Sequence, residues 1–167
     1  GLIVKATKAL LTEGYDFKTV IAGDGSAFKE IKQLVESYSL VDAIQLVGSV
    51  DGQEKIDAFA QSDIFILASR SESFGIVIAE AMSYGLDIIS TPVGIVPSVN
   101  DALDTISVFD IDDLEGLTDR MRSHLIYDRD SRRAVNLKNI EYCQNNFSIE
   151  AAETLLLSIY TSLVKSN

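Results

Sequence analysis

Two hydrophobic patterns alternate along the chain. The opening segment, GLIVKATKALLTEG, places Leu2, Ile3, Ala6, Ala9 and Leu10 at the spacing of one helix face. Short runs that are apolar at nearly every position follow at intervals, as expected for strands covered on both faces. The patterns predict strands at 17–23, 44–48, 64–69, 87–92 and 105–110, and helices at 1–14, 26–39, 53–62, 76–85, 112–126, 129–146 and 149–164.

Glycine and short polar residues mark the ends of several predicted helices. Glycine ends a helix readily, and serine or aspartate side chains accept hydrogen bonds from the first free backbone amides. The candidates are Gly14 and Gly85 as C-terminal stops, and Ser26, Asp112 or Asp113, and Ser148 as N-caps.

Strands that alternate with helices of this length predict an α/β fold with a Rossmann-like parallel sheet and helices on both faces. Such sheets bind ligands outside the carboxyl ends of their strands. The rule directs attention to the loops 23–26, 48–53, 69–76 and 91–98. Residues 1–167 contain no repeat or linker and are expected to form one domain. Its long helical tail is expected to pack on something outside this domain.

Composition narrows the classes of function. The chain of 167 residues is 47% hydrophobic and carries a net charge of −11, which argues against nucleic acid or an anionic membrane as the main partner. An anionic ligand would need a helix N-terminus, backbone amides or a local cation. Cys143 is the only cysteine, so a disulfide within the chain is excluded, and a reducing, cytoplasmic setting is consistent with this.

The segment GDGSAF (23–28) follows a predicted strand and opens a predicted helix, as a dinucleotide fingerprint does. Phe28 stands where the third glycine belongs, and Gly48 stands where an acidic residue would end the next strand. A nicotinamide site is therefore rejected. Two alternatives remain: a tight turn, or a turn in which Gly23 and Gly25 let a ligand approach the backbone.

The segment ESFGIVIAE (72–80) is more specific. The turn lies between a strand and a helix, where free backbone amides and the helix dipole favour a diphosphate. Glu72 and Glu80 bracket it, and carboxylates accept hydrogen bonds from pairs of sugar hydroxyls. The alternative is that Glu72 only complements the helix dipole and Glu80 is solvated. Apolar neighbours of Glu80 make its helix apolar nearly all round, so this carboxylate is expected to have a partner.

Other candidate chemistry is weaker. His124 is predicted to lie in a C-terminal helix away from the four loops, as a surface or packing residue, which leaves no imidazole base. Ser69, Ser71 and Ser73 have no nearby base to activate them. No Cys/His cluster indicates a metal site. The segment TPVGIVPS (91–98) predicts a rigid loop, with a lid over the same crevice as the alternative.

The segment SDIFILASRSESFGIVIAEAMSYGLDIISTPVG resembles the signature of retaining glycosyltransferases of family 4, whose two glutamates form an E-x7-E motif. The likeness extends in order over nearly the whole chain. It implies one half of a GT-B fold, in which two Rossmann-like domains face a cleft. Residues 1–167 would be the C-terminal, nucleotide-sugar-binding domain, without the N-terminal acceptor domain.

The resemblance also implies roles for individual residues. Glu72, the candidate catalytic residue, would contact the hydroxyls of the transferred sugar, and Glu80 would bind the ribose hydroxyls. The remaining donor-binding positions are the backbone of Ser73, Phe74, Gly75 and Ile76 for sugar and diphosphate, Gly48, Ser49 and Val50 for the base, and Gly23 and Asp24 near the phosphates.

The chain also departs from the family pattern. In the family, an arginine and a lysine that neutralise the diphosphate precede the first helix, and Gly1 aligns with the glycine after that lysine. The family's first strand of this domain, which lies mid-sheet, is also missing. Asp87, Ile95 and Ser98 stand where the family often has proline, glycine and glutamate.

The resemblance implies a hexosyltransferase that takes sugar from a nucleotide-diphosphate sugar, without a metal or other cofactor. Its reaction is a front-face one, in which the leaving phosphate helps deprotonate the acceptor. The expected acceptor is a cell-surface polysaccharide or glycolipid. The expected location is cytoplasmic, with peripheral attachment at the inner membrane face through the other domain as an alternative. The isolated chain is expected to have little activity. The alternative is a non-catalytic module of the same fold that binds a nucleotide or a protein.

Overall fold

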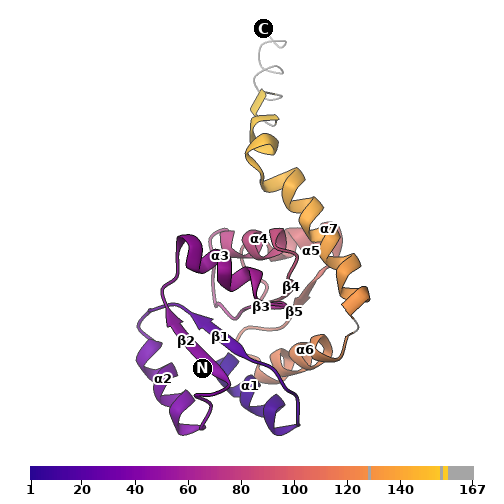
Figure 1. Ribbon diagram of the computed structural model, residues 1–167. Helices are drawn as coiled ribbons and strands as arrows, with labels where there is room; N and C mark the ends of the chain where they lie inside the picture. Colours follow the sequence, from indigo (N-terminus) through magenta and orange to yellow (C-terminus); the bar gives the residue numbers. More distant parts are fainter. Residues whose placement is uncertain (128, 155, 158–167) are drawn as a thin grey trace.

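The computed structural model describes residues 1–127, 129–154 and 156–157, and it alternates helices with short strands (Figure 1). Each predicted strand is present, shortened at one or both ends in most cases. In chain order the elements are α1 (Leu2–Thr12), β1 (Thr19–Ala22), α2 (Phe28–Ser37), β2 (Ile44–Gly48), α3 (Gly52–Ala60), β3 (Ile64–Leu67), α4 (Ile76–Ser83), β4 (Asp87–Ser90), α5 (Val96–Leu103), β5 (Ile106–Val108), α6 (Leu114–Ile126) and α7 (Arg129–Phe147).

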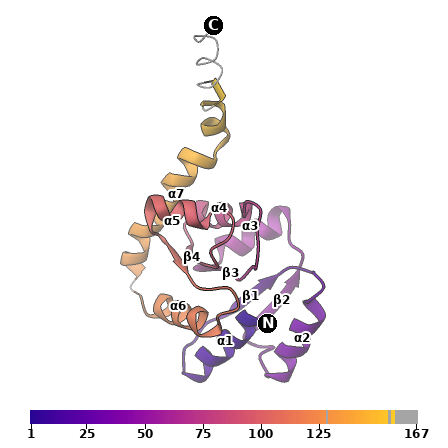
Figure 2. The same cartoon turned by 180° about the vertical axis from the view of Figure 1, so that it is seen from behind.

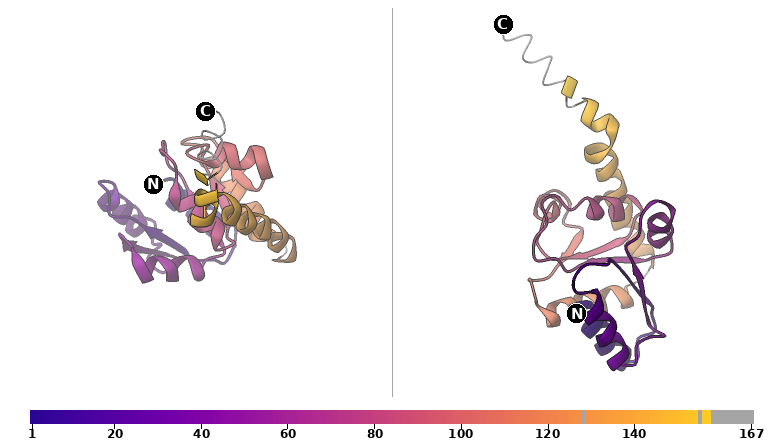
Figure 3. Two further views of the ribbon diagram at one scale, coloured as in Figure 1. Left: turned by 90° about the horizontal axis from the view of Figure 1, so that it is seen from above. Right: turned by 90° about the vertical axis from the view of Figure 1, so that its left-hand side faces the viewer.

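The strands form two parallel sheets, which confirms the predicted fold class. β1 pairs with β2, and β3, β4 and β5 pair in that order. Figures 1 and 3 show the two-stranded sheet beside the three-stranded one, with no strand of the described part pairing β1 to β3. This separation agrees with the expectation that a mid-sheet strand is missing.

Helices cover both faces of the three-stranded sheet. Ile88 and Ile89 are successive residues of β4, so they point to opposite faces, and both are fully buried. Ile88 belongs to a core that also contains residues of α4 and α5, whereas Ile89 packs with residues of α1 and α6. Figure 2 shows α5 and α6 on these two sides of the sheet. A third core joins α1 and α2 to the two-stranded sheet.

Several predicted helix ends are confirmed. The Asp113 carboxylate accepts a hydrogen bond from the Gly116 amide at 2.9 Å, and the Ser148 hydroxyl accepts one from the Ala151 amide at 3.1 Å. The prediction that Ser26 caps a helix is wrong, because α2 begins at Phe28 and Ala27 occupies the capping position without a side-chain bond.

The C-terminal helices extend away from the body (Figure 1). α7 packs on α4, where the Cys143 thiol donates to the Ala79 carbonyl at 3.4 Å. Residues 149–154 continue in a helix, as predicted. Most of the rest of the predicted helix 149–164 lies outside the described residues. None of the described helices has both the length and the apolar character needed to cross a bilayer.

Candidate functional site

The turn between β3 and α4 builds the start of a helix around Gly75. Gly75 has φ 81° and ψ 48°, in the left-handed region that glycine adopts without strain, and it precedes the first residue of α4. A Cβ there would lie 2.9 Å from the Cδ1 of Ile78. The Ile78 amide donates to the Gly75 carbonyl at 2.8 Å, and no side chain caps the helix, so the amides before Ile78 can receive an anion.

The segment after β4 holds this turn in place through two hydrogen bonds. The Ile95 amide donates to the Phe74 carbonyl at 2.9 Å, and the Thr91 hydroxyl donates to the Ser69 carbonyl at 2.6 Å. Val93 and Ile95 are buried. The predicted loop 91–98 ends earlier than expected, because α5 begins at Val96. Since Val93 and Ile95 are buried, the loop supports the turn and does not form a lid over it.

Glu72 lies exposed at the beginning of the same turn, where the Ser69 hydroxyl donates to its Oε1 at 2.9 Å. Ser73 is also exposed, and Phe74 and Ile76 are 48% and 65% exposed. The ring of Phe74 also packs edge-on against Phe147. An exposed carboxylate beside a helix start that no side chain caps can bind a ligand that is both polar and anionic.

Glu80 has the partner that the sequence predicted for it. Lys55, on α3, places its Nζ 2.6 Å from Glu80 Oε1, and each side chain is 34% exposed. The Oε2 atom of Glu80 is buried and accepts no hydrogen bond within the described part of the chain. Sequence reasoning did not single out Lys55, because only the packing of α3 beside α4 brings together residues 25 positions apart.

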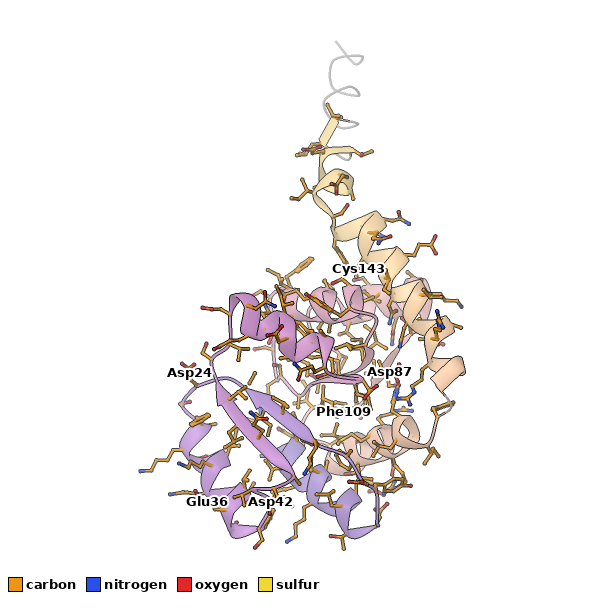
Figure 4. All side chains as sticks on the ribbon, in the orientation of Figure 1. Asp24, Glu36, Asp42, Asp87, Phe109 and Cys143 are labelled. Carbon is orange, nitrogen blue, oxygen red and sulfur yellow. The ribbon has the colours of Figure 1, made fainter. Side chains whose placement is uncertain are left out.

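The two glycine loops lie together. The Gly23 amide donates to the Gly48 carbonyl at 2.5 Å, which joins the ends of β1 and β2. Asp24 and Ser49 are exposed and Val50 is half-buried. Figure 4 shows Asp24 at the edge of the two-stranded sheet nearest α3. Because the loop 48–50 leads into α3, and α3 contacts α4 through Lys55, a chain of contacts links the glycine loops to the E-x7-E turn.

His124 is a packing residue, in agreement with one of the two predicted alternatives, but its contacts were not foreseen. Its Nε2 lies 2.8 Å from the Ser107 hydroxyl and its Nδ1 lies 3.0 Å from Asp87 Oδ2. Asp87 is only 3% exposed, and Arg132 lies 3.8 Å from the same oxygen. Asp87 begins β4, so its contact with His124 lies at the amino end of that strand, where Figure 4 labels Asp87. It stabilises a buried carboxylate and ties α6 and α7 to the sheet.

A cavity of about 380 Å³ lies at the same amino ends. Asp63 before β3, Gly85 before β4, and Arg132 and Asn136 of α7 are among its lining residues. It is therefore separate from the E-x7-E turn, which is at the carboxyl end of β3. Within the described residues, no group of three or more His, Cys, Asp or Glu side chains is arranged to hold a metal ion.

Comparison with known proteins gives one family. The family model described as Glycosyl transferases group 1 matches residues 1–140. The chain is 36% identical over 98 residues to the phosphatidylinositol N-acetylglucosaminyltransferase GPI3 subunit of Saccharomyces cerevisiae, covering 59% of this chain and 22% of that protein. It is 30% identical over 165 residues to N-acetyl-alpha-D-glucosaminyl L-malate synthase of Bacillus anthracis, covering 99% of this chain and 42% of that one.

Among solved structures, the crystal structure of Anabaena Alr3699/HepE in complex with UDP-glucose has the same fold. Its TM-score is 0.78 at 16% identity, and the match covers 96% of this chain and 44% of that one. The chain thus spans less than half the length of each of these three proteins.

Proposed function

Because the chain belongs to the Glycosyl transferases group 1 family, and its fold is that of a GT-B glycosyltransferase domain, we propose that it is the C-terminal, donor-binding domain of a retaining hexosyltransferase. Its donor is a nucleotide-diphosphate sugar. The full enzyme adds an N-terminal acceptor domain, and a strand from outside residues 1–167 fills the interval between β1 and β3.

One observation carries the proposal: Glu72 and Glu80 lie on either side of a helix start that no side chain caps. The diphosphate binds the amides of Ser73 to Ile76, where the helix dipole compensates for the acidic character of the chain. Glu72 receives hydroxyls of the transferred sugar, and Glu80 receives those of the ribose. Gly48, Ser49 and Val50 contact the base, and Gly23 and Asp24 lie near the phosphates.

The chemistry we propose needs no metal ion, because backbone amides and a helix N-terminus hold the diphosphate. Catalysis comes from positioning and from electrostatic stabilisation of the leaving phosphate, which helps deprotonate the acceptor. The UDP-glucose bound in the Anabaena protein of the same fold supports a nucleotide-sugar as the ligand.

The acceptor of the full protein is, in this proposal, a glycolipid or a growing polysaccharide. The yeast relative, named for transfer to phosphatidylinositol, supports a lipid-linked acceptor. Such an acceptor would be met in the cytoplasm at the inner face of a membrane, through the other domain. Fractionation of cells that express the full protein tests this location.

Calorimetric titration of the full-length protein with UDP-, GDP- and ADP-sugars tests the function. We expect one of them to bind, and we expect Glu72→Ala and Glu80→Ala each to weaken that binding at least tenfold, since each removes hydrogen bonds to a charged acceptor. Glu36→Ala, at an exposed position near the C-terminal end of α2, is the matched control (Figure 4). Unchanged binding in both site variants would end the proposal.

A non-catalytic nucleotide- or protein-binding module is the second candidate. It is favoured by Ile95 and Ser98, which stand where the family often has glycine and glutamate. The two candidates separate by turnover: tight binding of a nucleotide-sugar without release of nucleoside diphosphate, in the presence of a panel of acceptors, would favour the module. We expect release from the full-length protein and little or none from residues 1–167 alone.

A further inference from the structure

Lys55 holds one oxygen of the Glu80 carboxylate. It is the fourth residue of α3, close after the loop 48–50, and its ammonium reaches α4 to lie 2.6 Å from Glu80 Oε1. Both side chains are 34% exposed, so the pair lies at the surface boundary and is shielded from water more than an ordinary surface ion pair.

The second oxygen of the carboxylate, Oε2, lies in a different environment. Glu80 Oε2 is buried and has no hydrogen-bond partner among the described residues, although a buried carboxylate oxygen normally has one. Ile78, Ala81 and Met82, on the same helix, are fully buried apolar residues that offer no side-chain donor. Because Oε2 is out of reach of solvent while the side chain is 34% exposed, the carboxylate is open to a ligand on the side of Oε1, where Lys55 lies.

We propose that Lys55 is a positioning residue: it fixes Glu80 through Oε1 and so holds the open side of the carboxylate in place to accept a ribose hydroxyl of the donor. This inference rests on the proposed function and adds a residue to it. Lys55 acts through Glu80: the contact removes rotamer freedom that ligand binding would otherwise have to remove.

The test measures discrimination between two ligands in the full-length protein. UDP, GDP and ADP are titrated first, and the tightest of them is compared with its 2′,3′-dideoxy analogue, which lacks the ribose hydroxyls. The variants are Lys55→Met, Lys55→Arg, Glu80→Gln and the double variant Lys55→Met/Glu80→Gln. Thermal unfolding confirms that each is folded.

We expect the wild type to prefer the hydroxylated nucleotide by about tenfold or more, the range of a hydrogen bond to a charged acceptor. Lys55→Met should reduce this preference severalfold and change the affinity for the dideoxy analogue little. Lys55→Arg, which keeps the positive charge and N–H donors, should restore part of the preference. In the Glu80→Gln background, Lys55→Met should have little further effect, because both residues act on one contact.

Three results would overturn the inference, and they differ from a failure of the proposed function. Equal weakening of both ligands by Lys55→Met would mark Lys55 as a direct phosphate or base contact. An unchanged preference in Lys55→Met would remove its role altogether. If Lys55→Met does not fold, Lys55→Gln, which also lacks the charge, replaces it. An unchanged preference of Lys55→Gln for the hydroxylated nucleotide would likewise remove the role of Lys55. By contrast, loss of the preference in Glu80→Gln alone supports the site without Lys55, and no nucleotide binding at all ends both proposals.

Discussion

The backbone of Gly94 lies so close to the carbonyl of Phe74 that a Cβ on Gly94 would be 2.3 Å from that oxygen. Gly94 has φ 56°, and the next residue, Ile95, donates its amide to the same carbonyl at 2.9 Å. Two segments that are 20 positions apart in the sequence, at Phe74 and Gly94, are thus in direct backbone contact just before the start of α4.

Gly94→Ala should therefore destabilise the protein and distort the turn. Strain from a left-handed alanine and from a clash with backbone, which cannot rotate away, together cost about 2–4 kcal/mol. Urea denaturation measures the loss, and calorimetry should show weaker nucleotide binding. Gly25→Ala is the matched control for stability, because its Cβ would meet nothing within 4 Å and its φ is not positive. Equal stability of the two variants would contradict this account of the turn.

Ser69→Ala should weaken recognition of the sugar more than recognition of the nucleotide. The Ser69 hydroxyl orients Glu72 through a 2.9 Å hydrogen bond, and Glu72 is proposed to contact only the transferred sugar. We expect about fivefold weaker binding of the nucleotide-sugar, typical of one hydrogen bond, and unchanged binding of the nucleoside diphosphate. Ser71→Ala, at an exposed position of the same turn, is the control. A parallel loss for both ligands would show that the turn itself has moved.

His124→Ala should lower stability and leave donor binding intact. The substitution removes a partner from the Asp87 carboxylate, which is 3% exposed, and from the Ser107 hydroxyl. Loss of a partner from a buried charged group costs about 2–4 kcal/mol, measured by urea denaturation. Ser123→Ala, at an exposed position of the same helix, should change stability little. Reduced nucleotide binding at unchanged stability would assign the network to the site instead.

The sequence predicted the parallel sheet well, because strand and helix periods differ and each strand is apolar nearly throughout. It failed at α5, where the prolines and glycine of 91–98 favoured a loop. Pro97 is the second residue of α5, in the first turn, where a missing amide breaks no bond within the helix, so the proline is compatible with the helix start.

The site was predicted in part for a related reason. Glu72, Gly75 and Glu80 lie on one continuous segment, so their relation follows from a single turn and helix. The partner of Glu80 lies on another helix, and no local pattern connects Lys55 to it. Asp87 was noticed only as a departure from proline, since its contact with His124 depends on how α6 packs against β4.

Glu13→Gln should make stability less dependent on pH in the acid range. The Arg122 guanidinium donates to both oxygens of Glu13, each at 2.8 Å, and this hydrogen bonding holds the pKa of Glu13 below its ordinary value. The folded protein then keeps the carboxylate ionised where the unfolded chain protonates it. The stabilisation is present above the ordinary pKa and is lost as the pH falls through the folded pKa. The difference in unfolding free energy between wild type and variant should thus shrink between neutral pH and about pH 3. If the difference in unfolding free energy stayed constant over this pH range, the contact between Glu13 and Arg122 would not be the source of the pH dependence.

Cys143 should report when α7 leaves α4. The thiol is 5% exposed, and burial raises its pKa to about 11. Because the thiolate is the reactive form, alkylation at pH 8 should be about a hundredfold slower or more than in urea. The raised pKa of the thiol also contributes to the stability of the folded state below the ordinary thiol pKa. This contribution is lost as the pH rises through about 11.

Gly85→Ala sharpens this measurement. Its Cβ would lie 3.0 Å from the Cδ1 of Ile140, on α7, at a φ of 68°. The substitution should push α7 outward and speed alkylation of Cys143. Gly14→Ala introduces alanine at a similarly positive φ of 95°, with nothing within 4 Å, and should leave the labelling rate nearly unchanged. If both variants accelerate labelling equally, the cause is global loss of stability. If only Gly85→Ala does so, α7 opens as a separate unit from the sheet that carries the site.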